Sequence, residues 1–217
     1  MSAATPIDLA AWPRRQHFDH YRTVVPCTYS MTVELDVDNF VEALGQSGRR
    51  TYLAQIWALA SVVNRHSEFK MSLLPGGAPA VWDVIHPSFT IFRAETETFA
   101  SVWCPFDADF GTFHDSAAAL IRKHRDETDM FPQGPPPPNV FDVSSLPWAS
   151  FTGFNLNIAE SWDHLAPIFT LGKFVERVGQ TKLPLAVQVH HAAADGFHVS
   201  RLVNEVQALM NDPVWVE

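Results

Sequence analysis

A largely apolar run at residues 183–189 leads straight into His190 and His191, which are followed by three alanines and an Asp-Gly pair. A run of this length and composition is typical of a buried strand. The Asp-Gly pair ends the loop, and residues 197–210 have the spacing of a helix. The chain must therefore pass from a buried strand into a helix through one short loop, which fixes both histidines in the fold.

The histidines of this loop suggest acid–base chemistry. A histidine can take a proton from a hydroxyl near neutral pH, and residues in loops after strands often carry function. Small residues around His191 would leave room for a substrate. The spacing of His191 and Asp195 is weak evidence alone, because such pairs are more often structural. A metal site made by His190, His191 and His198 is the alternative, but adjacent histidines point to opposite sides of an extended chain.

Composition and charge exclude other classes of protein. The chain has 217 residues, 47% of them hydrophobic, with 16 Phe and 7 Trp, which indicates a globular protein. This length does not require two domains, and we expect one domain over residues 1–217. The formal net charge is −9, and no basic run exceeds the pairs Arg14-Arg15 and Arg49-Arg50, so nucleic-acid binding is not expected.

Compartment and redox state follow from the same composition. The apolar runs are too short to span a membrane and the N-terminus lacks a signal pattern, so we expect a soluble, cytoplasmic protein without a membrane partner. Cys27 and Cys104 match no metal spacing, and two free, buried thiols are expected.

The rest of the chain mixes strands and helices without strict βαβ alternation. This order favours a mixed β-sheet covered by helices, α/β or α+β in style, and no GxGxxG or Walker loop supports a nucleotide fold. A stiff loop is expected at the prolines of 132–138. Helices are predicted within 8–24, over 38–44 with Asp38 as N-cap and an end near Gly45, and over 51–65, 107–128 and 197–210. Strands are predicted over 27–37, 69–74, 80–85, 88–92, 99–103, 150–157, 167–175 and 184–190, with a turn at Gly76-Gly77.

Residues 188–198, Gln-Val-His-His-Ala-Ala-Ala-Asp-Gly-Phe-His, closely resemble the signature of the type A chloramphenicol acetyltransferases. Further blocks at 12–18, 97–99, 147–157 and 166–173 resemble the same family, in the same order along the chain. The HxxxDG motif alone is weak, because lipoyl-dependent acyltransferases and condensation domains of peptide synthetases share it. Several blocks in register are specific, and they imply the two-layer α+β sandwich of CoA-dependent acyltransferases.

The resemblance implies a mechanism. His191 would be the general base that takes the proton of the 3-hydroxyl of chloramphenicol, as that oxygen attacks the thioester of acetyl-CoA in a ternary complex. Ser144 would donate a hydrogen bond to the tetrahedral oxyanion, and Thr170 would bind a water. Asp195 would pair with Arg14 and hold the loop. A hydrogen bond to the inner ring nitrogen of His191 is expected to fix its tautomer, and His190 is expected to be structural.

Two binding surfaces are also implied by the resemblance. An apolar pocket for the aryl and dichloroacetyl groups would be lined by Tyr21, Cys27, Thr90, Phe99, Phe131, Phe154, Leu156 and Ile168. The cosubstrate acetyl-CoA would lie near Arg50, Trp148, Lys173 and Phe174. No metal is expected. The family is a homotrimer with sites at subunit interfaces, so His191 would face a pocket built largely by the neighbouring subunit.

Four residues depart from the family pattern. Asp142 stands where a neutral residue such as asparagine is common, His164 where an aromatic residue is found, Phe174 in place of a tyrosine and Ala194 in place of a cysteine. They leave the base and the serine in place and bear on substrate range. Two alternatives stay open: a related CoA-dependent acyltransferase acting on another alcohol or amine, and a non-catalytic drug-binding protein.

Overall fold

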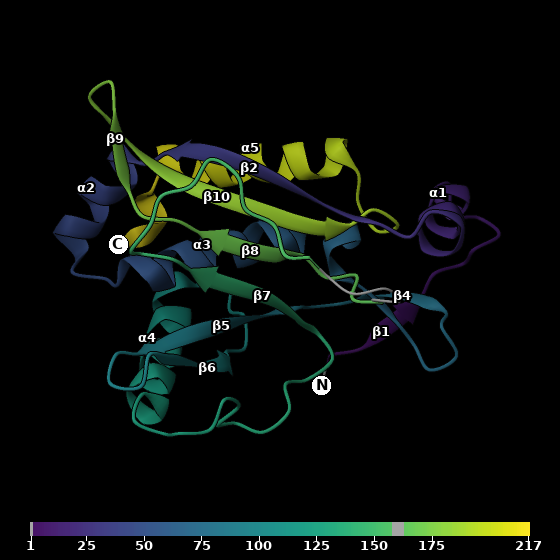
Figure 1. The fold of residues 1–217 in the computed structure, drawn as a ribbon, viewed down its shortest axis with the longest axis horizontal. Helices are drawn as coiled ribbons and strands as arrows, with labels where there is room; N and C mark the ends of the chain where they lie inside the picture. Colours follow the sequence, from purple (N-terminus) through teal and green to yellow (C-terminus); the bar gives the residue numbers. More distant parts are fainter. Residues whose placement is uncertain (1, 158–162) are drawn as a thin grey trace.

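A computed structural model describes residues 2–157 and 163–217, and two sheets organise it (Figure 1). The large sheet has seven strands in the order β2-β10-β8-β7-β5-β6, with β9 also paired to β10, and the small sheet has the order β1-β4-β3. The strands are β1 (Ala4–Pro6), β2 (Thr28–Asp36), β3 (Met71–Leu73), β4 (Pro79–Trp82), β5 (His86–Arg93), β6 (Thr98–Trp103), β7 (Val140–Ser145), β8 (Ile168–Leu171), β9 (Val175–Arg177) and β10 (Gln180–His190).

Helices cover one face of the large sheet, with α3 and α5 behind its strands in Figure 1. α3 is buried along most of its length, because it packs against the sheet and against α4 and α5. The helices are α1 (Arg15–Asp19), α2 (Asp38–Ser47), α3 (Thr51–Arg65), α4 (Phe110–His124) and α5 (Gly196–Asn211); a π-helical turn spans His20–Val24, and 3₁₀ turns span Ser67–Lys70 and Val214–Val216. Among the described residues, no helix is long and apolar enough to cross a bilayer.

Strand direction fixes where each strand ends. β10 runs antiparallel to β2 and β8, whereas β8 is parallel to β7 and β7 is parallel to β5. The C-terminal end of β10 therefore lies at the opposite end of the large sheet from the C-terminal end of β7.

The two faces of the large sheet differ in chemistry, because side chains alternate along a strand. Phe89, Val143, Phe169 and Val187 point to the helices and form the main core. The other face carries Ser88, Asp142, Ser144, Thr170 and Gln188 on the neighbouring positions of the same strands. We call this the polar face. One face packed on helices and one polar face confirm the predicted two-layer arrangement.

Residues 149–157 cross the polar face without forming a strand. The backbone N–H of Phe154 donates to Oγ1 of Thr32 at 3.2 Å, and that of Leu156 donates to Oε1 of Gln188 at 2.7 Å. The strand predicted over 150–157 is therefore wrong, since side chains of the sheet satisfy this backbone in place of a neighbouring strand.

β7 was not among the predicted strands. Only Phe141 and Val143 face the core, while Asp142 and Ser144 alternate with them on the polar face. The strand predicted over 167–175 is two strands, β8 and β9. Gly172 N donates to Pro184 O at 2.8 Å, but Pro184 has no N–H to return the bond, and the ladder is interrupted there.

The end of α2 also differs from the prediction. The helix continues through Gly45 and ends at Ser47, and Gly48 caps it with a left-handed φ of +67°. Asp38 is not the N-cap, because Val37 takes that position and the Asp38 carboxylate accepts from Thr181 N at 2.8 Å.

Other expectations hold. The long helix over 51–65 and the C-terminal helix form as predicted, and Gly76 and Gly77 turn the chain between β3 and β4 with positive φ. Both cysteines are free; Cys104 is buried as predicted, whereas Cys27 is only half-buried.

Candidate active site

His191 is the residue directly after β10, and aromatic rings hold it. Its ring stacks on that of Tyr21 with centroids 3.7 Å apart and planes 6° apart. The ring of Tyr29 meets it at 64° with centroids 5.2 Å apart. The backbone N–H of His191 donates to Cys27 O at 3.0 Å, which joins the loop to the start of β2. Both the ring and the backbone of His191 are therefore fixed.

The predicted hydrogen bond to the inner ring nitrogen is wrong. Nδ1 of His191 is buried and has no hydrogen bond to any described residue. Stacking on Tyr21 and packing against Tyr29 orient the ring instead. Tyr29 was missed at the level of sequence, because its nearness to His191 comes from its pairing with Val189 across β2 and β10.

Asp195 clamps the loop to the N-terminal segment, as predicted. Its Oδ2 lies 2.6 Å from Nη1 of Arg14, and its Oδ1 accepts from Phe197 N at 3.2 Å as the N-cap of α5. Nδ1 of His198 lies 2.8 Å from Oδ1. Burial raises the pKa of the Asp195 carboxyl, but the hydrogen bond from Arg14 and the charges of His198 and Arg14 outweigh it and leave the pKa below its ordinary value.

His190 is structural, as predicted. Only 3% of the residue is exposed, its Nδ1 accepts from Ala192 N at 3.1 Å, and burial lowers its pKa. The three alanines do not leave room for a substrate, which corrects that expectation. They are fully buried, and Ala192 and Ala193 pack in one cluster with Phe18.

The alternative metal site of His190, His191 and His198 does not form among the described residues. His198 is engaged with Asp195 at the start of α5, and His190 is buried against the loop backbone. Within residues 2–157 and 163–217, no group of three His, Cys, Asp or Glu side chains could hold an ion.

Ser144 lies at the other end of the large sheet, near the C-terminal end of β7. It pairs in register with Thr170 on β8, and both side chains point to the polar face. Thr90 on β5 follows the pair Phe89–Val143, which brings it beside Ser144 on the same face. These three residues form a group with hydroxyl side chains.

The separation of the two ends follows from the strand register. Ser144 pairs with Thr170, Thr170 pairs with Ala186, and His191 lies five positions beyond Ala186 on β10. That offset places His191 about 17 Å along the strands and about 10 Å across them from Ser144. A base and an oxyanion donor must both contact the same reacting atoms, so His191 and Ser144 of one chain are too far apart to fill these two predicted roles together.

The predicted drug-binding residues divide between the two ends. Tyr21 and Cys27 lie with His191, whereas Thr90, Phe99 and Phe131 belong to the Ser144 end: β6 carries Phe99, and Ser101 N bonds to the residue before Phe131 at 2.8 Å. The remaining three lie between the ends on the polar face: Ile168 pairs with Gln188, Leu156 bonds to Gln188, and Phe154 bonds to Thr32.

The residues expected near CoA gather at the Ser144 end. Lys173 N donates to Ala149 O at 2.9 Å, which brings Lys173 beside Trp148. The ring centroids of Trp148 and Phe92 lie 4.5 Å apart. Arg50 precedes α3, whose Tyr52 Oη donates to Val143 O at 3.3 Å. Arg50, Lys173 and Trp148 are exposed, so they are free to meet a ligand. Phe174 is half-buried against the main core.

Two of the departures from the family pattern meet on the polar face. Oδ2 of Asp142 lies 3.7 Å from Nε2 of His164. Burial raises the pKa of Asp142 and lowers that of His164, against the attraction between the pair. Ala194 is fully buried in the loop, where a small side chain fits.

The sequence matches known proteins over nearly its whole length. A family model described as Chloramphenicol acetyltransferase matches residues 2–207. Chloramphenicol acetyltransferase from Streptomyces acrimycini is 66% identical over 211 residues, covering 97% of this chain and 96% of that protein. Chloramphenicol acetyltransferase 3 from Escherichia coli is 39% identical over 207 residues, covering 95% and 97%.

The fold matches solved structures as well. A chloramphenicol acetyltransferase structure, 23% identical, superposes with a TM-score of 0.88 and covers 96% of this chain and 100% of its own. The dihydrolipoamide acetyltransferase of Azotobacter vinelandii, 18% identical, gives a TM-score of 0.69 with 93% and 88% covered. These likenesses confirm the predicted acyltransferase fold. With the sequence matches, they lead to one conclusion: the chain belongs to the chloramphenicol acetyltransferase family.

Proposed function

We infer that this chain is a chloramphenicol O-acetyltransferase, and we propose that acetyl-CoA is its donor and the 3-hydroxyl of chloramphenicol its acceptor. Acetylation of the drug would give antibiotic resistance in the cytoplasm, where acetyl-CoA is available. Membership of the family and the 66% identical relative support this activity. The arrangement of His191 and Ser144 supports the finer proposal below.

The observation that carries the mechanism is the separation of His191 from Ser144. The register of β7, β8 and β10 puts them too far apart to act on one substrate within a chain. A second copy that sets its Ser144 end against the His191 end of the first would complete a site. Such a head-to-tail contact closes into a ring when its rotation allows, and a homotrimer with three interface sites is the proposed assembly.

In this site His191 is the general base. One ring nitrogen takes the proton of the drug hydroxyl as its oxygen bonds to the thioester carbon of acetyl-CoA. The carbonyl oxygen becomes an oxyanion. When it reforms the carbonyl, the carbon–sulfur bond breaks, and the CoA sulfur leaves with the proton held by His191. Tyr21 keeps the ring in place by stacking.

Ser144 of the neighbouring copy donates its hydroxyl hydrogen to the oxyanion, and Thr170 beside it holds a water. Asp195 does not take part in the proton transfer. Its carboxylate is held by Arg14 and by the start of α5, so its role is to fix the loop.

The binding surfaces follow the same division. Chloramphenicol lies between the His191 end of one copy and the Ser144 end of the next, against Tyr21, Cys27, Thr90, Phe99, Phe131, Phe154, Leu156 and Ile168. CoA lies at the Ser144 end, where the exposed cations Arg50 and Lys173 contact its phosphates. Trp148 and Phe174 flank the pantetheine arm of CoA.

A related acyltransferase with a different acceptor is the second candidate. The Asp142–His164 pair favours it, because Asp142 pairs in register with Ile168, and the two polar side chains lie beside a proposed drug contact. An acceptor with its own hydrogen-bonding groups would use that pair better than an apolar ring does.

The test follows release of free thiol from acetyl-CoA in the presence of chloramphenicol. The wild-type chain is expected to release thiol, and His191→Ala is expected to lower kcat by about 10²–10⁴-fold. His17→Ala, an exposed histidine of α1, is the matched control and should keep full activity. No thiol release by the wild type would exclude chloramphenicol as substrate. Full activity in His191→Ala would exclude His191 as the base.

A further inference from the structure

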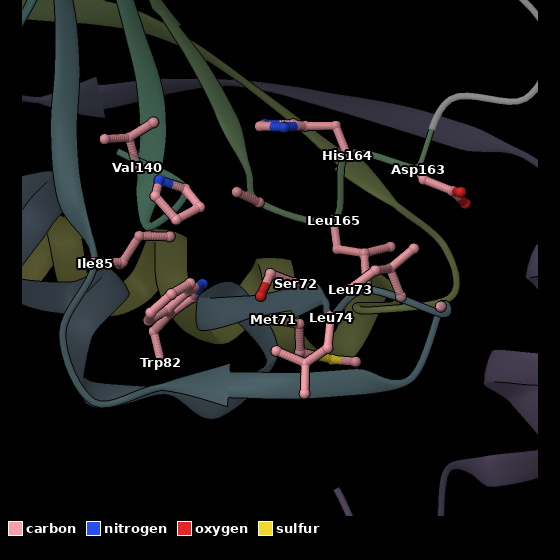
Figure 2. Close-up of a pocket in the computed structure, with 13 residues that line it drawn as sticks. Met71, Ser72, Leu73, Leu74, Trp82, Ile85, Val140, Asp163, His164 and Leu165 are labelled. Carbon is pink, nitrogen blue, oxygen red and sulfur yellow. The ribbon is translucent and has the colours of Figure 1, made fainter. Parts of the chain in front are cut away.

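A cavity of about 400 Å³ adjoins the His191 loop and the Asp142–His164 pair (Figure 2). Ser72 and Trp82 of the small sheet form one wall, and His164 and Leu165 form the opposite wall. Ile85 and Val140 close the side at the starts of β5 and β7. The volume falls within the range of small-molecule sites, about 300–1,000 Å³. Of the described residues that line this cavity, none is among those proposed to contact chloramphenicol or CoA.

Two hydrogen-bonding groups in the wall lack a partner. Oγ of Ser72 and Nε1 of Trp82 are both buried, and no described residue bonds to either. Ser72 pairs with Ala80, and Trp82 lies two positions beyond Ala80, so both side chains project from one face of the small sheet. Buried polar groups in folded proteins nearly always have a partner. Two unpaired donors beside one cavity therefore indicate an occupant that carries an acceptor.

The Ser72 hydroxyl can turn toward such an occupant. It makes no hydrogen bond where it stands, so rotation of its side chain between staggered positions breaks none. The indole N–H of Trp82 can only donate, which fixes the complementary group as a hydrogen-bond acceptor.

The rest of the wall indicates an uncharged occupant. Most lining side chains are apolar, among them Met71, Leu73 and Leu165. The carboxylate of Asp163 points away from the cavity in Figure 2 and lies 3.2 Å from Nε of Arg22. His164 is set against Asp142 rather than presenting an isolated charge. A charged ligand would find no unpaired opposite charge among these residues.

Residues of the cavity wall also support the loop that carries His191. Met71 and Leu165 pack in one cluster with Ala192 and Ala193 of the His191 loop. Arg22 joins the rim, because its Nη1 donates to Gly77 O at 3.1 Å, and the preceding residue is Tyr21, which stacks on His191. A molecule in the cavity therefore contacts side chains that hold the base.

We propose that this cavity is a second binding site, for a small uncharged molecule that is largely apolar and has one carbonyl or ether oxygen. The oxygen accepts from Ser72 and Trp82, and the apolar part fills the space between Met71, Leu165 and Val140. Occupancy changes kcat for acetyl transfer through the shared cluster and does not compete with chloramphenicol.

The test uses 4-fluoroacetophenone, observed by fluorine NMR on the full-length protein in its native assembly. The matched probe is 1-ethyl-4-fluorobenzene, which has a similar shape and no carbonyl. The ketone is expected to bind more tightly than the hydrocarbon. Ser72→Ala and Trp82→Phe should each lower the affinity for the ketone by roughly five-fold, the usual loss for one hydrogen bond. Neither variant should change the affinity for the hydrocarbon. Ser101→Ala, a serine of β6 away from the cavity, is the control and should change neither.

A filling variant and a kinetic assay complete the test. Ser72→Leu, which removes the unpaired hydroxyl and occupies the space, should abolish binding of both probes without lowering Tm. In steady-state assays the ketone should lower or raise kcat with no change in KM for chloramphenicol. The proposal would be overturned if the ketone bound wild type no more tightly than the hydrocarbon does, or no more tightly than it binds Ser72→Ala. Binding of either probe to Ser72→Leu, or competition with chloramphenicol, would also overturn it. Absence of binding by either probe would also overturn it, and would leave ordered water as the occupant.

Discussion

The two ends of the large sheet are built for different tasks. At the His191 end the key side chain is enclosed: two tyrosine rings hold it, and an ion pair from Arg14 fixes its loop. At the Ser144 end Thr170 is buried and Ser144 is half-buried on the polar face, and only Trp148 and Lys173 beside them are exposed. In the proposed mechanism the first end supplies a base that must keep its orientation, and the second supplies the surface that binds the ligands. Under the proposed mechanism neither end is an active site alone, so the reaction requires assembly of two copies.

The sharpest way to break this comparison is to mix two inactive variants. His191→Ala and Ser144→Ala are each expected to be nearly inactive as pure proteins. After unfolding and refolding together in equal amounts, roughly one quarter of the interface sites should contain both native residues. Thiol release should therefore recover to about a quarter of the wild-type value. Mixing the double variant with wild type serves as a control for dilution of active subunits.

Failure of the mixture to recover, with proven exchange of subunits, would mean that His191 and Ser144 act within one chain. That outcome would contradict the separation derived from the strand register.

Ser144→Ala measures what the Ser144 end contributes to the chemical step. Loss of a donor to an oxyanion usually lowers the rate by about 10²–10³-fold, and we expect that fall in kcat with little change in KM. Ser145→Ala is the matched control, since Ser145 is the next residue of β7 and its side chain points to the other face. A change confined to KM would assign Ser144 to substrate binding instead.

Asp195→Asn tests the clamp at the enclosed end. The folded-state pKa of Asp195 is lowered, so its ionised form is stabilised on folding. This stabilisation is present above the unfolded pKa, about 3.9, and is lost as pH falls through the folded value. The variant should have a lower Tm than wild type at pH 7, by about 2–4 °C for each kcal/mol lost at this length, and the difference should shrink below about pH 4.

The comparison is Arg14→Lys, which keeps the charge but not the geometry of the guanidinium. It should retain part of the stability and most of the pH dependence. If the difference in Tm between wild type and Asp195→Asn did not depend on pH, the charge of the carboxylate would not be what stabilises the fold.

Lys173→Ala should have the smallest effect. An exposed cation contributes little to a contact with phosphate in a screened site, so a rise of about two- to five-fold in KM for acetyl-CoA is expected, with kcat unchanged. Lys123→Ala, in the last turn of α4, is the control. The effect should fade at high salt. A large fall in kcat would move Lys173 from ligand binding to the reaction itself.

Local pattern predicted those parts of the fold that bury apolar residues in a regular spacing. α3, α5 and β10 are such elements, and the Asp-Gly pair marked the end of the loop before α5. The sequence pattern did not predict β7, because half of its residues face the polar side, where a sheet needs no apolar side chains. The segment 150–157 has the composition of a strand but bonds to Thr32 and Gln188 side chains, which no local pattern reveals.

The site divides in the same way. Resemblance to a family predicted roles for His191, Ser144, Arg14 and Asp195, and the structure shows the ion pair between the last two. The distance between His191 and Ser144 depends on β10 running against β8 and β7, a property of the whole sheet. The role of Tyr29 depends on the same pairing, so it could not be read from neighbouring residues along the chain.

Tyr21 reaches His191 from the π-helical turn His20–Val24, in which Val25 N bonds to His20 O at 2.9 Å. Such a turn accommodates one more residue than an α-helical turn. Deletion of His20 alone would remove the extra residue of this turn and move the tyrosine one position along the helix, away from the imidazole. Because no residue of this turn is buried, the deletion would leave a folded protein in which the proposed base, His191, has lost the ring stacked against it.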